Sequence, residues 1–286
     1  MPGTQSGYCQ FHSIETAVTK VYNDLLLAVD DGDVSARCLL DLTAAFDTVD
    51  HDLLMLRLER QFGLRSVVLQ WFRSYLTGRT FQVIYADRKS SMVIICCSVP
   101  QGSVLGPRMF ILYMADLEDT VAAQDARLHA YTDDTQLNLK CHTQEATTAA
   151  AHTLQACITD VTAWMNMNTL KLNADKTELL WAGSKYGSAL LGSSGPSLQL
   201  GAETIKASDH VRLLGVTISS DLSLDKHFLL YVQRASIGSV RSADYVDHST
   251  QTPQLLLYTL SLRLVSTTVT RCWLGCQGPS PTGFNG

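Results

Sequence analysis

Two adjacent aspartates, Asp133 and Asp134, have the most distinctive chemistry in this sequence. Two carboxylates about 4 Å apart repel each other by roughly 1–4 kcal/mol, depending on the local dielectric constant. A divalent cation bound between them reverses the sign of that interaction. A simple turn is the other explanation, because aspartate is common in turns and tolerates positive φ. Both interpretations stay open for these two residues taken alone.

Asp41 favours the cation. It is the only charged residue in residues 38–42, an apolar run typical of a buried strand. A charge inside a sheet is costly unless it is paired or bound to a metal. If the strand of Asp41 lies beside the 133–134 turn, three carboxylates converge at one end of a sheet and can hold two Mg²⁺ ions. The alternative is a buried aspartate that is hydrogen-bonded to the backbone.

The elements that must position these carboxylates follow from the spacing of apolar residues. Positions three and four residues apart predict helices, and apolar runs between turn residues predict strands. Helices are expected over residues 15–29, 50–62, 64–76 and 147–167, with another from the loop at 100–107 to about residue 117. Strands are expected over residues 37–42, 178–181 and 211–218, hairpins over 80–98 and 129–139, and a loop over 183–201. This order predicts an α+β fold with a split β-α-β sheet.

Composition excludes several classes of protein. Of the 286 residues, 46% are hydrophobic and 17% are charged, which excludes collagen-like, fibrous and disordered chains. The net charge of −5 excludes a polybasic nucleic-acid coat protein. Residues 30–52 hold seven acidic residues and one arginine, whereas residues 57–89 hold seven basic and two acidic residues. An acidic block beside a basic strip suits an enzyme that binds a metal and a polyanion, although two solvated faces would give the same pattern.

Sorting signals and cysteine pairs are not evident. The N-terminus lacks a basic start followed by an apolar run, and no apolar run approaches the roughly 20 residues of a membrane-spanning helix. The eight cysteines are irregularly spaced and form no Cys-x-x-Cys pair, so neither a disulfide framework nor a zinc module is expected. We therefore expect a soluble, intracellular protein with no membrane partner.

Five segments resemble, in order, the motifs of reverse transcriptases from LINE-type, non-LTR retrotransposons. Residues 40–51 (Leu-Asp-Leu-Thr-Ala-Ala-Phe-Asp-Thr-Val-Asp-His) resemble the first catalytic motif, and residues 98–107 (Ser-Val-Pro-Gln-Gly-Ser-Val-Leu-Gly-Pro) resemble the second. Residues 131–134 (Tyr-Thr-Asp-Asp) are similar to the third, with threonine where the family commonly has alanine. Residues 172–178 (Leu-Asn-Ala-Asp-Lys-Thr-Glu) and 214–216 (Leu-Gly-Val) resemble the two that follow. Five motifs in the family's order are much more specific than any one alone.

The resemblance implies a role for each motif residue. Asp41 and Asp133 would be the principal ligands of two Mg²⁺ ions, with Asp134 beside them and Mn²⁺ as a substitute metal. Four further residues would contact the nucleotide. One is a bulky ring that excludes a 2′-hydroxyl, and another is an amide that can hydrogen-bond. The other two are a glycine that admits close backbone approach and an ammonium near the triphosphate. These residues are Phe46, Gln101, Gly102 and Lys176. On spacing alone, Phe46 would be a core aromatic and Lys176 a surface residue.

The same resemblance implies the partners and the fold. Leu214, Gly215 and Val216 would contact the primer strand, and the basic strip at 57–89 could contact template or primer phosphates. The partners would be an RNA template, a DNA primer and deoxynucleoside triphosphates, in the nucleus. The fold would be a reverse-transcriptase palm, a split β-α-β antiparallel sheet with packed helices. The oligomeric state is not implied.

The resemblance also divides the chain. Residues 1–36 would be a remnant of the fingers and the helix that enters the palm, residues 37–230 the palm core, and residues 231–286 a degraded, thumb-like or irregular tail. Residues 7–13 stand where the family has a Gly-Phe-Arg run, whose arginine contacts the triphosphate. We therefore expect a truncated copy, with incomplete fingers and thumb and no endonuclease domain.

The sequence thus predicts an RNA-directed DNA polymerase domain that transfers a nucleotide to a primer 3′-hydroxyl with two metal ions. Because the fingers arginine is replaced, primer extension is expected to be weak or absent. The alternative is a catalytically inactive remnant that binds nucleic acid weakly. A two-metal nuclease would explain the carboxylates but not residues 98–107.

Overall fold

The computed structural model describes residues 3–124, 126–141, 144–183 and 195–230. The chain divides into two compact units, residues 1–227 and 228–286. Every helix and strand with defined bounds lies in the first unit. The tail expected over residues 231–286 lies outside the described residues.

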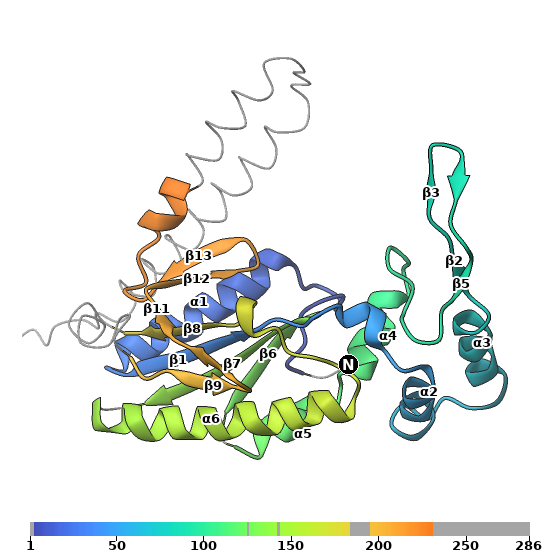
Figure 1. Cartoon of the computed structure of the whole chain (residues 1–286). Helices are drawn as coiled ribbons and strands as arrows, with labels where there is room; N and C mark the ends of the chain where they lie inside the picture. The colour runs from blue at the N-terminus through green and yellow to red at the C-terminus, as the bar shows by residue number, and fades with distance from the viewer. Residues whose placement is uncertain (1–2, 125, 142–143, 184–194, 231–286) are drawn as a thin grey trace, which may run out of the picture. The chain divides into compact units, whose positions relative to one another are not determined.

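A five-stranded sheet forms the centre of the first unit (Figure 1). Its spatial order is β11 (Ala207–Ser208), β8 (Glu178–Ala182), β1 (Val34–Leu40), β7 (Asp134–Cys141) and β6 (Arg127–Tyr131). All neighbours are antiparallel except β11 and β8. Chain order and spatial order together give a split β-α-β arrangement, because β8 returns beside β1 after the β6–β7 hairpin. The α+β palm fold expected from the sequence is confirmed.

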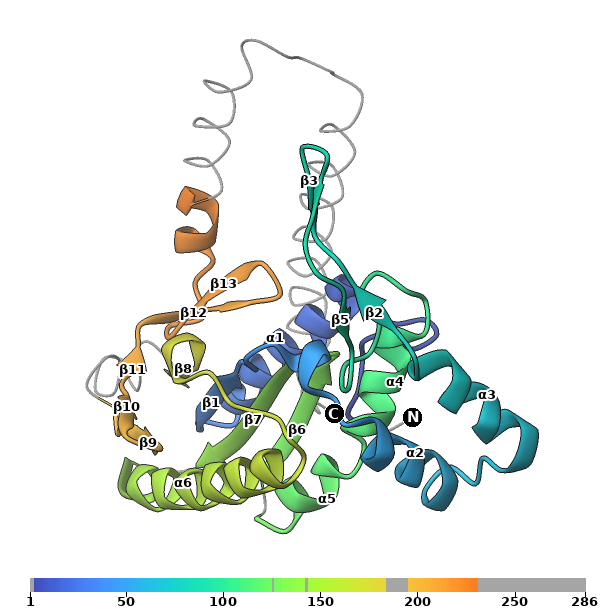
Figure 2. The ribbon, with the colours of Figure 1, turned by 45° about the vertical axis from the view of Figure 1, so that its right-hand side comes forward.

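Helices α5 (Leu117–Ala122) and α6 (Gln144–Met167) cover one face of this sheet (Figures 1 and 2). Alternate strand residues such as Cys38 and Leu137 pack on Leu154 and Ile158 of α6 in the main hydrophobic core. The small hairpin of β9 (Leu198–Leu200) and β10 (Glu203–Ile205) also contacts this core.

Helix α1 (Ile14–Asp30) covers the opposite face together with the β12–β13 hairpin (Figure 1). Ser13 begins the helix through a capping box with Thr16. Val21 and Leu25 of α1 pack on Leu180 of β8 and on apolar residues of β12 (His210–Leu213) and β13 (Val216–Ser219). The sheet is therefore buried on both faces, which fixes the position of its strand ends.

A more exposed region follows the first motif. It contains η1 (Ala45–Thr48), α2 (His51–Arg60), α3 (Ser66–Leu76) and a hairpin in which β2 (Thr80–Phe81) pairs with β5 (Val93–Ile94) and β3 (Ile84–Tyr85) with β4 (Arg88–Lys89). The side chain of Asp50 accepts from Leu53 N at 2.8 Å and so caps α2, as its position predicted. Helix α4 (Gly106–Tyr113) then leads back to the sheet, and η2 (Ala174–Lys176) precedes β8.

Several expected boundaries were wrong. The strand expected over 211–218 is two strands, because Leu214 and Gly215 both have positive φ (46° and 90°) and form a hairpin turn. The helix expected to end near residue 117 ends at Tyr113, and a second helix, α5, begins at Leu117. Part of the loop expected over 183–201 is strand β9, and residues 184–194 lie outside the described part. The first strand ends at Leu40, so Asp41 follows the strand instead of lying within it.

No described helix is both long enough and apolar enough to span a membrane. The cysteines at described positions are free thiols.

Candidate active site

The register of the central strands brings Asp41 beside the aspartate pair. Strand β1 ends with Leu40 paired to Thr135 of β7, so Asp41 comes next to Asp134, the first residue of β7. Asp133 lies in the turn between β6 and β7, where Tyr131 pairs with Asp134. The three aspartates therefore lie at one end of the sheet, although Asp41 and Asp133 are 92 positions apart in sequence.

The pKa values of these aspartates respond to one another. Burial, together with the charges of Asp133 and Asp41, raises the pKa of Asp134 to about 6. Burial also raises the pKa of Asp133, and the charge of Asp41 adds to the effect. The site thus concentrates negative charge that the protein itself leaves partly uncompensated.

A second segment lies against Asp41. Asn173 N donates to the carbonyl of Asp41 at 2.9 Å, and Thr43 N donates to the carbonyl of Lys171 at 2.8 Å. These bonds place Lys176 Nζ 3.6 Å from Asp41 Oδ1. Lys176 keeps 67% of its side chain exposed, so its ammonium remains accessible to a ligand from solvent.

The donor set suits a hard divalent cation. Asp41 Oδ1 is buried and has no hydrogen-bond partner among the described residues, and carboxylate oxygens are the ligands that Mg²⁺ prefers. Within the described ranges, however, no three His, Cys, Asp or Glu side chains form a group that could hold a metal ion. The type of the ligand atoms therefore fits a divalent cation. The three aspartate side chains, in the conformations that the structure has, do not form a closed set of ligands.

The expected nucleotide residues lie around the segment that follows Asp41. Phe46, on η1, is half-buried and stacks on Phe110 of α4, with ring centroids 4.9 Å apart. Val99 N donates to the Phe46 carbonyl at 2.9 Å, and Gln101 Nε2 donates to Asp47 Oδ1 at 2.8 Å. The second motif is thus held directly against the first. Phe46 therefore acts in part as a core aromatic, because only one portion of its side chain is packed against the core.

Gly102 stands at a turn that requires its residue type. Its φ is +73°, a conformation that residues with a Cβ rarely adopt. No heavy atom lies within 4 Å of the point where a Cβ would stand. The backbone is therefore open to close approach at this position.

Leu214, Gly215 and Val216 form the turn between β12 and β13. Leu214 and Val216 pack at the edge of the α1-side cluster, and Gly215 is exposed. Arg212 N donates to Glu178 Oε2 at 3.0 Å, which ties the hairpin to the start of β8. No contact among the described residues joins this turn to the three aspartates, so its primer role stays a prediction.

Arg57 does not belong to an accessible basic strip. Its side chain is only 6% exposed and pairs with Asp116 at 2.9 Å. It also donates to Asn168 Oδ1 at 2.7 Å and to the Tyr113 carbonyl. The remaining basic residues of the strip are exposed or half-buried: Arg60, Arg65, Arg73, Arg79, Arg88 and Lys89.

Gln5 contacts the aspartate turn, and sequence reasoning missed it. Gln5 Oε1 accepts from Thr132 N at 2.9 Å and from Gly7 N at 2.7 Å. A Cβ on Gly7 would lie 2.5 Å from Thr132 Oγ1, so glycine is required for this approach. Thr132 itself has φ of +62°, which is strained for a β-branched residue. The pairing spans 127 residues of sequence, so no local pattern could have revealed it.

A split β-α-β sheet with aspartates at the ends of its central strands is the architecture of a polymerase palm. Residues 2–218 match the family described as Reverse transcriptase (RNA-dependent DNA polymerase). The chain belongs to this family, and its relatives identify it as a LINE-type, non-LTR reverse transcriptase domain. Reverse transcriptases generally use divalent metal ions.

The relatives are proteins of mobile elements. The RNA-directed DNA polymerase from mobile element jockey of Drosophila melanogaster is 27% identical over 232 residues, which are 79% of this chain and 24% of that protein. The probable RNA-directed DNA polymerase from transposon BS of the same organism is 28% identical over 239 residues, 82% of this chain and 25% of that protein. The chain thus spans about a quarter of the length of these relatives.

A solved structure has the same fold. The telomerase of Candida albicans, in complex with a fragment of telomeric RNA, superposes with a TM-score of 0.51 and 14% identity. The match covers 94% of this chain and 44% of the telomerase chain. At this identity the likeness concerns the fold alone.

Proposed function

We propose that this domain extends a DNA primer on an RNA template by two-metal nucleotidyl transfer, with deoxynucleoside triphosphates as substrates. The observation that supports the proposal is the register that places Asp41 with Asp133 and Asp134 at the end of β1 and β7, where burial and the charge of Asp41 both raise the pKa values of Asp133 and Asp134. Carboxylates held together against their own repulsion are the arrangement that a bound cation stabilises.

Asp41 and Asp133 would hold Mg²⁺, with Asp134 beside them and Mn²⁺ as a substitute. When bound, the ions would supply activation of the primer 3′-hydroxyl and charge neutralisation on the leaving phosphate oxygen. Lys176, 3.6 Å from Asp41, donates its ammonium to the triphosphate and balances charge as it develops. The carboxylates thus bind the positive metal ions, and the ammonium binds the negative triphosphate.

The nucleotide lies between the first and second motifs. The ring of Phe46, fixed by Phe110, contacts the sugar and rejects a 2′-hydroxyl by shape. Gln101, fixed by Asp47, presents its amide, and Gly102 lets the backbone approach the nucleotide. Packing of these two motifs against each other supports this arrangement, because it holds both groups in position before substrate binds.

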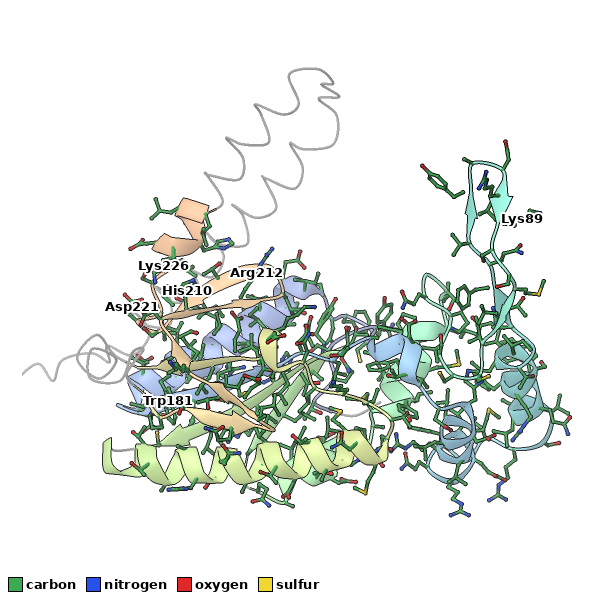
Figure 3. The ribbon with its side chains drawn as sticks, viewed as in Figure 1. Lys89, Trp181, His210, Arg212, Asp221 and Lys226 are labelled. Carbon is green, nitrogen blue, oxygen red and sulfur yellow. The ribbon has the colours of Figure 1, made fainter. Side chains whose placement is uncertain are left out.

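Nucleic acid binds through exposed basic side chains on two hairpins. Figure 3 shows Lys89 near the tip of the β3–β4 hairpin and Arg212 on the β12–β13 hairpin. The Leu214–Val216 turn beside Arg212 contacts the primer. Template and primer phosphates are neutralised by these groups, so binding weakens steeply as salt rises.

Primer extension tests the proposal. The full chain is incubated with an RNA template, an annealed DNA primer, deoxynucleoside triphosphates and Mg²⁺. We expect weak extension that requires the metal, is lost in Asp133→Ala and is retained in the matched control Asp119→Ala, which removes an exposed aspartate of α5. Extension that survives Asp133→Ala would overturn the assignment.

A catalytically inactive, nucleic-acid-binding domain is the second candidate. The segment at residues 7–13 favours it, because it replaces the Gly-Phe-Arg run of the family and lacks the arginine that contacts the triphosphate. Fluorescence anisotropy with a labelled primer–template at increasing salt distinguishes the two. Salt-dependent binding without any extension by the wild-type chain selects the inactive domain.

A further inference from the structure

A cavity of about 330 Å³ lies beside the central sheet. Its lining comes from strands β1, β6 and β7 and from helices α1 and α5. Gly3 and Thr4 line it near the N-terminus. None of the three aspartates lines it, so it is distinct from the candidate active site.

A buried guanidinium faces this cavity. Arg37 of β1 is 1% exposed, and its Nη1 donates to Gln136 Oε1 at 2.9 Å. Its Nε has no hydrogen-bond partner among the residues that the structure describes. A buried donor without an acceptor is costly, and more so on a charged group. Arg37 Nε therefore lacks a hydrogen-bond acceptor. The cavity has room for a ligand that would supply one.

The neighbours of Arg37 also offer donors. Because arginine only donates, the Gln136 atom that faces it must be the oxygen, which leaves Gln136 Nε2 as a donor. That nitrogen and His129 Nδ1 are likewise buried without partners in the described part of the chain. Strand register places Gln136 opposite His129 and Arg37 opposite Asn138, so all four side chains share one sheet face.

The charge of Arg37 has little direct compensation at this site. Asp24, the carboxylate whose field acts on Arg37, is itself paired with Lys20 Nζ at 2.9 Å. Lys20 and Asp24 both line the cavity, where their charges offset each other. Arg127 and Glu118, also in the lining, are of opposite sign. The positive charge of Arg37 is thus not balanced by the other lining residues, and a ligand that compensates it is anionic.

We propose that this cavity binds a small oxyanion such as inorganic phosphate, held by the lining residues Arg37 and His129, while Gln136, outside the lining, orients the Arg37 guanidinium through its hydrogen bond. Oxygen acceptors of the anion satisfy the donors that the fold leaves open, and its charge compensates the buried guanidinium. The site is independent of the proposed polymerase function, because it uses another region of the sheet.

Thermal unfolding of the full chain tests the site, with potassium phosphate compared to potassium chloride at equal ionic strength and pH 7.5. We expect phosphate to raise Tm by about 3 °C at roughly ten times its dissociation constant. Arg37→Met should reduce this shift to the small part that all variants share, while unfolding no earlier than the wild-type chain in chloride. Arg88→Met, which removes an exposed arginine of β4, should keep the shift.

The comparison of variants separates binding in the cavity from general effects of salt. Phosphate also stabilises proteins by exclusion from their surface, and that effect is equal in all variants. An equal shift in wild type and Arg37→Met, or no shift in wild type, would overturn the proposal. If Arg37→Met does not fold, Gln136→Leu takes its place, with the loss of phosphate binding measured by calorimetric titration. Unchanged heats in that variant would also overturn it.

Discussion

At the scale of single residues, the charges of the candidate active site lower the stability of the fold. Asp133 and Asp134 have raised pKa values because they are partly buried next to each other and to Asp41. A site built to bind a cation is destabilised while the cation is absent, since the same repulsion that attracts the ion opposes folding. Removing one carboxylate should therefore stabilise the metal-free protein.

Asp134→Asn tests this expectation. The pKa of Asp134 is about 6 in the folded chain, above its usual value of 3.8. The folded state therefore binds more protons between these values, so the unfolding free energy rises as pH falls from 6 to 3.8. At pH 7 without metal, Asp134→Asn should add about 1 kcal/mol, a value reduced for solvent screening. Urea unfolding with EDTA measures it, and Asp119→Asn should change nothing.

His129 has the opposite pH dependence. Burial lowers the pKa of this imidazole to about 4 from 6.5. The unfolded state binds more protons between these values, so stability is full above pH 6.5 and is lost as pH falls toward 4. The unfolding free energy should drop by about 2 kcal/mol between pH 7 and pH 5 on account of this group. His129→Gln should remove that drop in urea unfolding, whereas His152→Gln, at an exposed position, should keep it.

At the scale of elements, the β6–β7 hairpin depends on a segment far from it in sequence. Ser6 N donates to the Ala130 carbonyl and Ala130 N donates to the Thr4 carbonyl, at 2.8 and 3.0 Å. Residues 4–6 thus extend the sheet past β6 and deliver Gln5 to the turn. Because Thr132 is held at positive φ, the turn needs outside support to keep its aspartates in place.

Gln5→Ala should loosen this turn. The two backbone donors at Thr132 and Gly7 would lose their acceptor, at a cost of about 1–2 kcal/mol. We expect lower stability in urea and faster hydrogen exchange at the Thr132 amide. Gln10→Ala, which removes an exposed glutamine from the same segment, should leave both measurements unchanged. Equal exchange at Thr132 in the two variants would show that Gln5 does not hold the turn.

At the scale of the whole first unit, Arg57 joins elements that are far apart in sequence. It reaches from α2 to the end of α4, to Asp116 before α5 and to Asn168 after α6. Its guanidinium also lies over the rings of Tyr113 and Trp164, at 4.8 and 5.2 Å. One buried cation thus connects the exposed helical region to the helices beneath the sheet.

Arg57→Met should destabilise the chain strongly. The ion pair would be broken, and Asp116 and Asn168 would lose their donor, a loss of about 3 kcal/mol. Arg60→Met removes the exposed arginine one turn later in α2 and should cost less than about 0.5 kcal/mol. Urea unfolding compares the two variants. Equal losses would mean that the charge of α2 matters, and not the contacts of Arg57.

Local pattern predicted much of the fold. The apolar spacing of α1 and α3, the cap at Asp50 and the two hairpins came from residues close together in sequence, where periodicity is decisive. The turn at 214–215 was missed because a glycine within an apolar run was read as part of one strand. Arg57 was misjudged because its burial depends on partners 59 and 111 residues away.

The sequence by itself determined the family, through five motifs in order, and the identity of the acidic residues. Only the tertiary structure decided that β1 pairs with β7 in the register that brings Asp41 to Asp134, and that Gln5 reaches the turn between them. It also decided that Arg37 lies buried beside a cavity. Such contacts join distant segments, and they are selected by the packing of both sheet faces, a property of the assembled chain that no local pattern contains.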